Sequence, residues 1–365
     1  MISPAAKPPA PSGGWLSRLS ARLASPQPLL ALISLTTLLA AGWLLDRYRD
    51  GVAQAARETL TAIAEHRRDA VEQQLASLRR EAELFASASV HIADEMEAWI
   101  EGDFQDRHLE QDLDRHFRER VEADRYLSIA LFDASGQARL RIGQPLAGDG
   151  AGLMRDTVAG ASLKLIDHMT LPPEVASVGY LAPIRVKGQP RGGLLLTQRA
   201  EPTLYPLLGA RPYASRTRET YLIRRDGATW RALTPLRFPV TGDGQFRLPA
   251  ELAPVGLLEP RFSAGAPDYR GESAMFHVTP VRGTDWLVVA QQDRNEIFAA
   301  TRQTVGFVAP LLLLVLGLFH ALVHLLQRAH AERKRDDDLD KDTRLAEIAS
   351  SLDTVLWEAD PATGA

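Results

Sequence analysis

The sequence contains no cysteine, which removes several kinds of chemistry at once. Disulfides, thiolate catalysis and cysteine-ligated zinc or iron–sulfur sites are all excluded. Basic residues are not in excess either, because the net charge is −4 and Lys and Arg are scattered, so no nucleic-acid surface is indicated. With 365 residues, 45% of them hydrophobic and 24% charged, the chain has room for two or three ordinary domains.

Motifs of known enzymes are also missing. The sequence has no P-loop, no His-Glu-x-x-His and no Gly-x-Ser-x-Gly. The glycine-rich stretch 148–152 does not join a strand to a helix and is interpreted as a loop. The acidic run 336–342 resembles a calcium loop but lacks its turn glycine and closing Glu, so it is interpreted as a solvated helix face. We therefore predict no catalytic residue, no metal site and no cofactor.

Charge is absent from two long segments, residues 23–45 and 303–327, apart from the histidines of the second. Each has about the ~20 apolar residues that cross a hydrocarbon layer of ~30 Å. The first could instead be a signal peptide, but its apolar run exceeds the ~7–15 residues usual there and no small-x-small cleavage site is evident. The second could be a buried core helix, which its length argues against. We predict transmembrane helices at 26–46 and 304–327, with Pro310 as a tolerated kink.

The charges flanking these spans predict their orientation. Basic residues without acidic ones precede the first span, and basic residues follow the second: Lys7, Arg18, Arg22, then Arg328, Arg333, Lys334 and Arg335. The positive-inside rule therefore places both termini in the cytoplasm and residues 47–303 on the other side of the membrane. The Pro-, Ala- and Ser-rich residues 1–25 are interpreted as a disordered cytoplasmic tail.

The long segment between the spans begins as helix. Residues 47–121 contain no proline, and apolar residues recur at helical spacing, which predicts one or two long stalk helices. The period then changes to that of strands. Residues 122–200 contain the hairpins YLSIALFDASGQARLRIG and ASVGYLAPIRVKGQPRGGLLLTQ, separated by a loop with a short helix. This pattern predicts a PAS-like module, which we name the first module.

The pattern recurs in residues 201–292, which we name the second module. Its hairpins are TYLIRRDGATWRALTPL and SAMFHVTPVRGTDWLVVAQQD. Trp286 alternates with Val288 and is placed in the core, and Gly283 supplies the turn. The predicted fold class is α+β: a long stalk helix and two PAS-like modules between two transmembrane helices.

The end of the chain is expected to be mostly helical. A return helix over 293–303 should run into the second span and on through a signalling helix over 328–350 without a break. The closing run TVLWEADPATG then predicts a strand and a turn. We interpret residues 351–365 as the beginning of a truncated PAS domain.

Several motifs carry a resemblance to a known family. They are EPTLYPLLGARPYASRTRETYLIRRDG at 201–227, DYRG at 268–271 and VRGTDWLVVAQQDRNEIF at 281–298. With the helix–module–module–helix order, they resemble bacterial inner-membrane receptors with a periplasmic double Cache domain. Where the family usually has Trp-Pro, this chain has Arg211-Pro212.

The resemblance implies a small-molecule periplasmic ligand bound by the first, membrane-distal module, a homodimer in the lipid bilayer, and a cytoplasmic PAS domain feeding a GGDEF/EAL output for cyclic di-GMP. A sensor histidine kinase is the alternative, and a ligand-free structural anchor is a second one. The amino-acid signature of some Cache families, an Arg near a Trp-Tyr pair, is not visible, so we name no ligand.

Candidate ligand-binding residues lie in the first module. In the strand QARLRI, strict alternation puts Ala138, Leu140 and Ile142 on one face and two arginines on the other. Arginine binds carboxylates through two parallel hydrogen bonds, so this face suits an anionic ligand. Other polar side chains occur in segments expected to close over the sheet. The candidates are Arg139, Arg141, Asp167, His168 and Tyr180. The alternative is that both arginines are simply solvated.

Two histidines lie inside the second predicted span. His320 and His324 are four residues apart, on one helix face. Ionisable residues within a membrane span are candidates for function, and such a pair can ligate a metal or haem. Both lie near the cytoplasmic end, however, where an imidazole can reach the interface, so solvated side chains are the competing interpretation.

Overall fold

The computed structural model describes residues 27–87, 91–144, 150–160, 162–169, 175–209, 215–239, 245–247 and 260–357. The chain divides into two compact units. One comprises Met1–Arg49 with Ala300–Ala365, and the other comprises Asp50–Ala299. The predicted tail over 1–25 lies outside the described residues.

Two helices in the structure are long and apolar enough to cross a membrane: α2 (Gln27–Ala86) and α9 (Ala299–Trp357). Their most apolar windows have mean hydropathies of 2.0 and 2.4, and no part of either window is buried inside the protein. Exposed apolar surface of this extent is unfavourable in water, so both windows are candidate membrane spans. Pro310 lies within α9 and does not end it.

Within this unit the two helices contact each other along narrow stripes. The less exposed residues of α2 recur every three or four positions, at Leu30, Ser34, Thr37, Ala41 and Leu45. Corresponding positions of α9 include Leu312, Leu316, His320 and Val323. A side-chain contact between Ser34 and His320 shows that the stripes face each other. The large apolar side chains on the remaining faces, such as Trp43 and Phe307, are exposed.

The predicted stalk is divided into three helices. The helix α2 ends at Ala86, and α3 (His91–Glu101) and α4 (Arg107–Glu122) follow. Asp106 starts α4 because its carboxylate accepts hydrogen bonds from the backbone N–H groups of His108 and Leu109. The prediction of one or two long helices over 47–121 is therefore wrong after Ala86, where no proline marks the break.

The first module contains a five-stranded antiparallel sheet, which we name sheet A. Its strands are β1 (Ser128–Asp133), β2 (Ala138–Gly143), β3 (Lys164–His168), β4 (Ser177–Val186) and β5 (Gln189–Arg199), in the order β2-β1-β5-β4-β3. Both predicted hairpins are present as β1–β2 and β4–β5. Lys187 and Gly188 both have positive φ, of 50° and 77°, which is the two-residue turn that suits a twisted hairpin. The edge strand β3 was not predicted.

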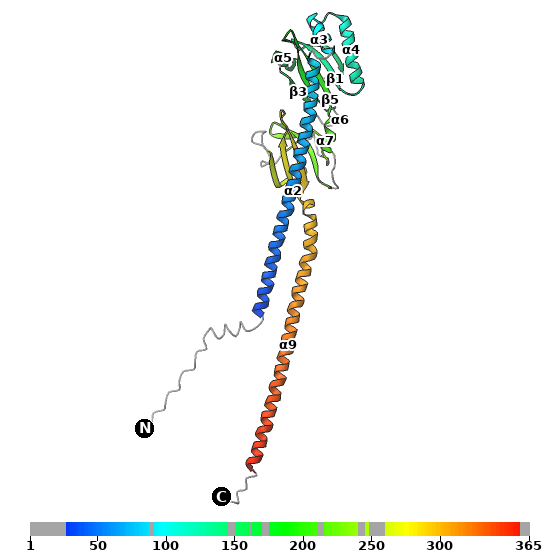
Figure 1. Cartoon of the computed structure of the whole chain (residues 1–365). Helices are drawn as coiled ribbons and strands as arrows, with labels where there is room; N and C mark the ends of the chain where they lie inside the picture. Colours follow the sequence, from blue (N-terminus) through cyan, green and yellow to red (C-terminus); the bar gives the residue numbers. More distant parts are fainter. Residues whose placement is uncertain are drawn as a thin grey trace, which may run out of the picture. The chain divides into compact units, whose positions relative to one another are not determined.

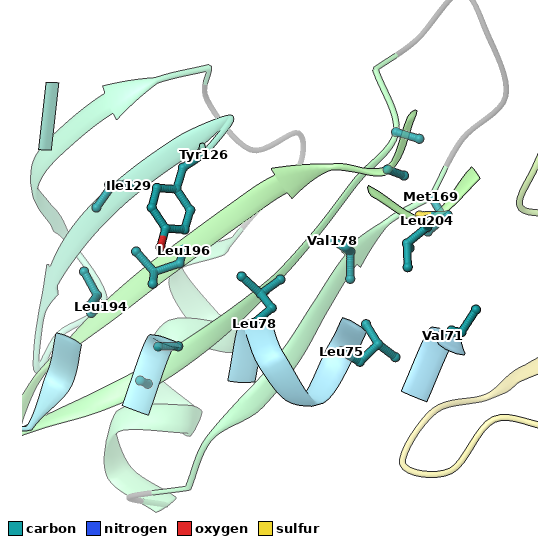
Figure 2. Close-up of a cluster of buried hydrophobic side chains, with 14 of the residues drawn as sticks. Val71, Leu75, Leu78, Tyr126, Ile129, Met169, Val178, Leu194, Leu196 and Leu204 are labelled. Carbon is teal, nitrogen blue, oxygen red and sulfur yellow. The ribbon is translucent and has the colours of Figure 1, made fainter. Parts of the chain in front are cut away.

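Sheet A buries one face against α2. Figure 2 shows Leu75 and Leu78 of α2 packed toward Val178 and Leu196 of the sheet. The helix α5 (Gly150–Gly160) covers the other face, where Leu181 and Leu195 belong to a separate apolar cluster. A Cβ atom at Gly193 would lie 3.1 Å from the side chains of both Leu181 and Val158. Glycine at this position therefore allows α5 to approach the sheet closely.

The second module contains a six-stranded antiparallel sheet, which we name sheet B, in the order β8-β7-β6-β11-β10-β9. The strands are β6 (Glu219–Asp226), β7 (Thr229–Ala232), β8 (Gln245–Phe246), β9 (Arg261–Pro267), β10 (Ser273–Pro280) and β11 (Trp286–Asp293). Two short helices, α6 (Ala200–Thr203) and α7 (Tyr205–Gly209), connect the modules. The predicted hairpins are β6–β7 and β10–β11, and β8 and β9 were not predicted.

Sheet B also buries one face against α2, whose 50–86 segment runs beside both sheets in Figure 1. Trp286 is fully buried and packs with Val288 in the cluster beneath α2, so its predicted core position is confirmed. Gly283 has a φ of 73° in the turn before it. The opposite face of sheet B carries an aromatic cluster that includes Tyr221, Phe246 and Phe276.

Two expectations about the end of the chain are wrong. The helix is not continuous from Asp293, because α8 (Arg294–Ile297) and α9 are separated by Phe298, whose φ and ψ are −93° and 9°. The strand expected from Thr354 is not present over the described residues, since α9 continues to Trp357. The rest of the predicted strand and turn lies outside the described residues.

Candidate functional site

The face of sheet A beneath α5 combines small, polar and apolar residues. Arg141 lies directly opposite Ala130 in the β1–β2 register, so it shares this face with the Leu181 and Leu195 cluster. Ser128 and Thr197 are both buried there, with their hydroxyl oxygens 2.8 Å apart. Thr197 Oγ1 also accepts from the backbone N–H of Ser128 and contacts the Ser128 carbonyl oxygen, so its hydrogen-bonding capacity is used within the sheet, whereas the Ser128 hydroxyl keeps capacity for a further hydrogen bond.

The two predicted arginines do not form a pair. The β1–β2 register shifts between Leu131 and Phe132, so Phe132 pairs with Ala138 and Arg139 occupies a β-bulge. The alternation expected for the strand is therefore broken, and Ala138 packs on the opposite face from Leu140.

Arg139 already has partners. Its Nε donates to Asp133 Oδ2 at 2.7 Å, and its guanidinium lies 5.1 Å from the ring centroid of Phe104. Burial raises the pKa of Asp133, but hydrogen bonds from Ser135, Gln137 and Arg139 outweigh it and the net shift is downward. The structure gives Arg141 no such partner among the residues it describes, and its side chain is exposed. Arg141 thus differs from Arg139 in having an exposed side chain.

Asp167 lies at the other edge of sheet A and binds the second module instead. Its Oδ2 accepts a hydrogen bond of 3.0 Å from Trp286 Nε1, and its Oδ1 accepts one from Arg224. The Asp167 side chain is 14% exposed, Arg224 is 27% exposed and Trp286 is fully buried. The role predicted for Asp167, in closing a ligand site over the first module, does not match this position.

The remaining two predicted residues lie on β3 and β4. Tyr180 pairs with Leu196, on the face toward α2, and is half-buried. Burial raises the pKa of the Tyr180 hydroxyl. His168 is the last residue of β3 and pairs with Ser177. Since β2 and β3 are the two opposite edges of sheet A, the five predicted residues do not converge on one site.

Within the unit that contains the two apolar helices, His320 uses both ring nitrogens. Its Nε2 lies 3.5 Å from Ser34 Oγ of the other apolar helix, and its Nδ1 lies 2.9 Å from the carbonyl oxygen of Leu316. Among the described residues no group of three or more His, Asp or Glu side chains could hold a metal ion. His320 therefore joins two helices, and no ligand set for a metal accompanies it and His324.

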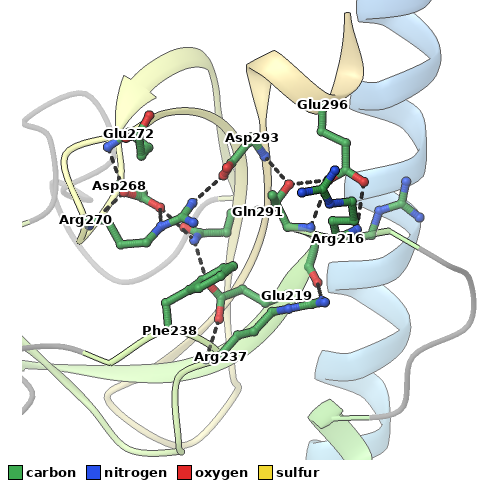
Figure 3. Close-up of polar contacts among 12 residues, drawn as sticks. Arg216, Glu219, Arg237, Phe238, Asp268, Arg270, Glu272, Gln291, Asp293 and Glu296 are labelled. Carbon is green, nitrogen blue, oxygen red and sulfur yellow. Dashed lines mark hydrogen bonds and ion pairs between the residues drawn. The ribbon is translucent and has the colours of Figure 1, made fainter. Parts of the chain in front are cut away.

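A second group of polar residues lies at one end of sheet B and is drawn in Figure 3. Arg270 Nε donates to Asp268 Oδ2 at 2.6 Å, and its Nη2 donates to Asp293. Its guanidinium also lies 4.2 Å from the ring centroid of Phe238. Asp268 Oδ1 accepts the backbone N–H groups of Arg270 and Glu272 at 2.7 and 3.0 Å. The DYRG motif is thus a turn held by its own aspartate.

Glu219 extends this group toward the aromatic face of sheet B. Tyr269 Oη donates to Glu219 Oε1 at 2.5 Å, and Gln291 Nε2 donates to the same oxygen at 2.7 Å. Burial raises the pKa of Glu219, and these hydrogen bonds oppose the shift only in part. Each polar side chain here is satisfied by the protein itself, so the group stabilises the end of β11.

Glu296 of α8 is held by the segment before β6. The backbone N–H groups of Arg216 and Thr217 donate to its two carboxylate oxygens at 2.8 and 2.9 Å, and Ser215 Oγ lies 3.1 Å from both. Partial burial raises the pKa of Glu296, but hydrogen bonds from Thr217, Arg216 and Ser215 outweigh it, and the pKa is lowered. This contact attaches α8 to the segment that leads into β6.

No family model matches the sequence, and no curated protein matches it. Solved structures that are similar are ligand-binding domains of chemoreceptors. The sensory domain of the Campylobacter jejuni chemoreceptor Tlp3 with isoleucine is 12% identical, with a TM-score of 0.49, covering 68% of this chain and 96% of that one.

Two further structures complete the comparison. The domain of the Pseudomonas aeruginosa amino acid chemoreceptor PctC with GABA is 16% identical, with a TM-score of 0.42, covering 66% of this chain and 99% of that one. The ligand-binding domain of Mlp24 with asparagine is 12% identical, with a TM-score of 0.46, covering 70% of this chain and 98% of that one. Because these sequence identities and TM-scores are low, the function of this chain is inferred from its own residues.

Sequence reasoning missed the partners of Asp167. Trp286 was correctly assigned to the core, but nothing in its strand pattern indicates a partner for its indole N–H. A buried Trp N–H usually has an acceptor, but the sequence does not indicate which one. The Ser128–Thr197 pair was missed because both residues fit an ordinary strand.

Proposed function

We propose that this chain is the sensory part of a membrane receptor, and that its first module binds a small anionic molecule. The single observation that carries the proposal is the placement of one two-module unit, Asp50–Ala299, between two apolar helices whose windows are unburied. A soluble enzyme has no need of two such helices. A receptor needs one for attachment and a second to pass a change across the membrane.

The ligand site in this proposal is the α5 face of sheet A. Arg141 supplies a positive charge there, and the buried Ser128 hydroxyl, held by Thr197, supplies a hydrogen-bonding group. A guanidinium recognises carboxylates and phosphates through two parallel hydrogen bonds, which favours an anionic ligand. Arg139 is not part of this site, because Asp133 and Phe104 already hold it.

We further propose that residues 47–303 face the periplasm of a bacterial inner membrane, that both termini are cytoplasmic, and that the receptor acts as a homodimer. The helix α9 then leads to a cytoplasmic PAS domain and an output that makes or cleaves cyclic di-GMP. A sensor histidine kinase is the alternative output. Cyclic di-GMP turnover in membranes that contain the natural protein would support the first output, and transfer of phosphate from ATP to a histidine would support the second.

Thermal unfolding of the full chain in nanodiscs, against a panel of organic acids, phosphates, amines and amino acids, tests the ligand proposal. A ligand at 100 times its dissociation constant stabilises the folded state by about 2.7 kcal/mol. We expect an anion to stabilise the parent and Arg139→Ala alike, and Arg141→Ala less. No stabilisation by any compound would favour a ligand-free structural anchor instead.

A further inference from the structure

The contact made by Asp167 joins the two modules at a specific pair of residues. Its carboxylate accepts from Arg224 on β6 and Trp286 on β11. These two residues are direct partners in the β6–β11 register, so one carboxylate holds adjacent strands of sheet B. We name Asp167, Arg224 and Trp286 the inter-module bridge.

On the first-module side the bridge is attached to an edge strand of sheet A. The strand β3 is the edge of sheet A and is paired only with β4 within that sheet. Ile166, next to Asp167 on β3, belongs to the Leu181 and Leu195 cluster on the α5 face. A ligand that displaces this face would therefore displace β3, and Asp167 with it.

On the second-module side the bridge is attached to a strand that is held firmly. The strand β11 lies between β6 and β10, and every residue from Trp286 to Gln292 is buried. It spans about 24 Å at ~3.4 Å per residue. Its last residue, Asp293, precedes α8 directly, and α9 begins six residues beyond, at Ala299.

Asp285 is a second carboxylate that interacts with Arg224 of the inter-module bridge. Burial raises the pKa of Asp285, the Arg224 charge opposes this shift, and the Asp167 charge adds to it. If Asp167 were removed, Arg224 could turn to Asp285, and the Trp286 N–H would lose its acceptor inside the core. The three residues of the inter-module bridge therefore favour one arrangement of the two modules over others.

We propose that the inter-module bridge is the route by which the first module controls the residues that lead into α9. In this mechanism Asp167 is a positioning residue, and movement of β3 is passed through the Arg224–Trp286 pair along β11 to α8. The alternative route is α2, which packs against both sheets through residues such as Leu60, Leu75 and Leu78. The inference rests on the proposed sensory function, but its test requires no ligand.

The test measures whether a disturbance in the first module reaches α8. Gly193→Val is the disturbance, because its side chain would press on Leu181 and Val158 on the α5 face. Hydrogen exchange of residues 287–297 is measured in the full chain in nanodiscs, with and without Gly193→Val, in the parent and in Asp167→Ala. Asp226→Ala is the matched control, because it removes a carboxylate–arginine contact of sheet B at the β6–β7 hairpin.

We expect Gly193→Val to change exchange at 287–297 in the parent and in Asp226→Ala, and not in Asp167→Ala. Asp167→Ala alone should speed exchange of these amides by roughly 10–100-fold, because a buried donor loses its acceptor. If Asp167→Ala does not fold, Trp286→Phe removes only the indole N–H and should also weaken the response.

An equal response to Gly193→Val in the parent, Asp167→Ala and Trp286→Phe would overturn the proposal and assign the coupling to α2. No response in the parent would also overturn it, since the disturbance would then not reach β11. A failed ligand panel with an intact bridge response would refute only the proposed function, so the two failures are distinguishable.

Discussion

Replacing Arg270 with alanine should destabilise the second module, and the structure sets the magnitude. The Asp268 side chain is fully buried, so its charge would remain in the protein without its cation. Removing one partner of a buried pair typically costs about 3–5 kcal/mol. Arg270 is 17% exposed and Asp268 keeps two backbone N–H donors, so we expect a smaller loss of unfolding free energy, about 2–3 kcal/mol.

For a domain of this size, that loss corresponds to a decrease in Tm of about 4–12 °C. Thermal unfolding of the full chain in detergent can be followed by tryptophan fluorescence, since Trp99, Trp230 and Trp286 are all buried. The matched control is Arg231→Ala. Its pair with Asp226 is 32% and 45% exposed, so the control should lose no more than about 1 kcal/mol.

Chemical rescue of Arg270→Ala tests whether the shape of the guanidinium group, and not only its charge, stabilises the second module. Ethylguanidinium replaces the side-chain atoms that Arg270→Ala removes, and its planar group can donate to Asp268 and Asp293 while stacking on Phe238. Millimolar ethylguanidinium should raise the Tm of Arg270→Ala saturably, whereas ethylammonium should not. Equal Tm values for Arg270→Ala and Arg231→Ala would refute the estimate, and equal rescue by ethylammonium would show that only charge matters.

Three other predictions follow from the same structure. Gly179→Ala should unfold or severely destabilise the first module, because its Cβ would lie 2.2 Å from the carbonyl oxygen of Leu196; Gly51→Ala, with no atom within 4 Å, should instead stabilise α2 by about 0.5–1 kcal/mol in urea unfolding. The pKa of Glu296 is lowered on folding, so its stabilisation is complete above the unfolded value of about 4.3 and is lost as pH falls through the folded pKa. Glu296→Gln should therefore show a flatter decline in Tm below about pH 5 than the parent, and an unchanged slope would contradict this. The purified 365-residue chain should show no cyclase, phosphodiesterase or autokinase turnover in radiolabelled-nucleotide assays, and measurable turnover would contradict the absence of catalytic motifs.

The fold was largely predictable because each element has a strong local pattern. The apolar windows and the four hairpins follow from hydropathy and turn residues, as at Lys187-Gly188. The short strands β3 and β8 were missed because they are edge strands with few apolar residues. The break at Phe298 was missed because no proline or glycine marks it, and tertiary contacts of Glu296 fix α8 instead.

The candidate site was much less predictable. Strict alternation assigned Arg139 and Arg141 to one face, but the β-bulge at Arg139 depends on pairing with β1, which the sequence of β2 alone does not encode. The contacts of Asp167 were not predicted, because its partners lie 57 and 119 residues away along the chain. Long-range polar pairs of this kind leave no periodic signal.

The interruption at Phe298 has a practical consequence for building hybrid receptors. Because α8 and α9 are separated at Phe298, they are not one continuous helix, and α9 begins at Ala299. A foreign segment joined at Phe298 would therefore leave the helical phase within α9 unchanged. A junction placed inside α9 would instead shift that phase by about 100° for every residue gained or lost.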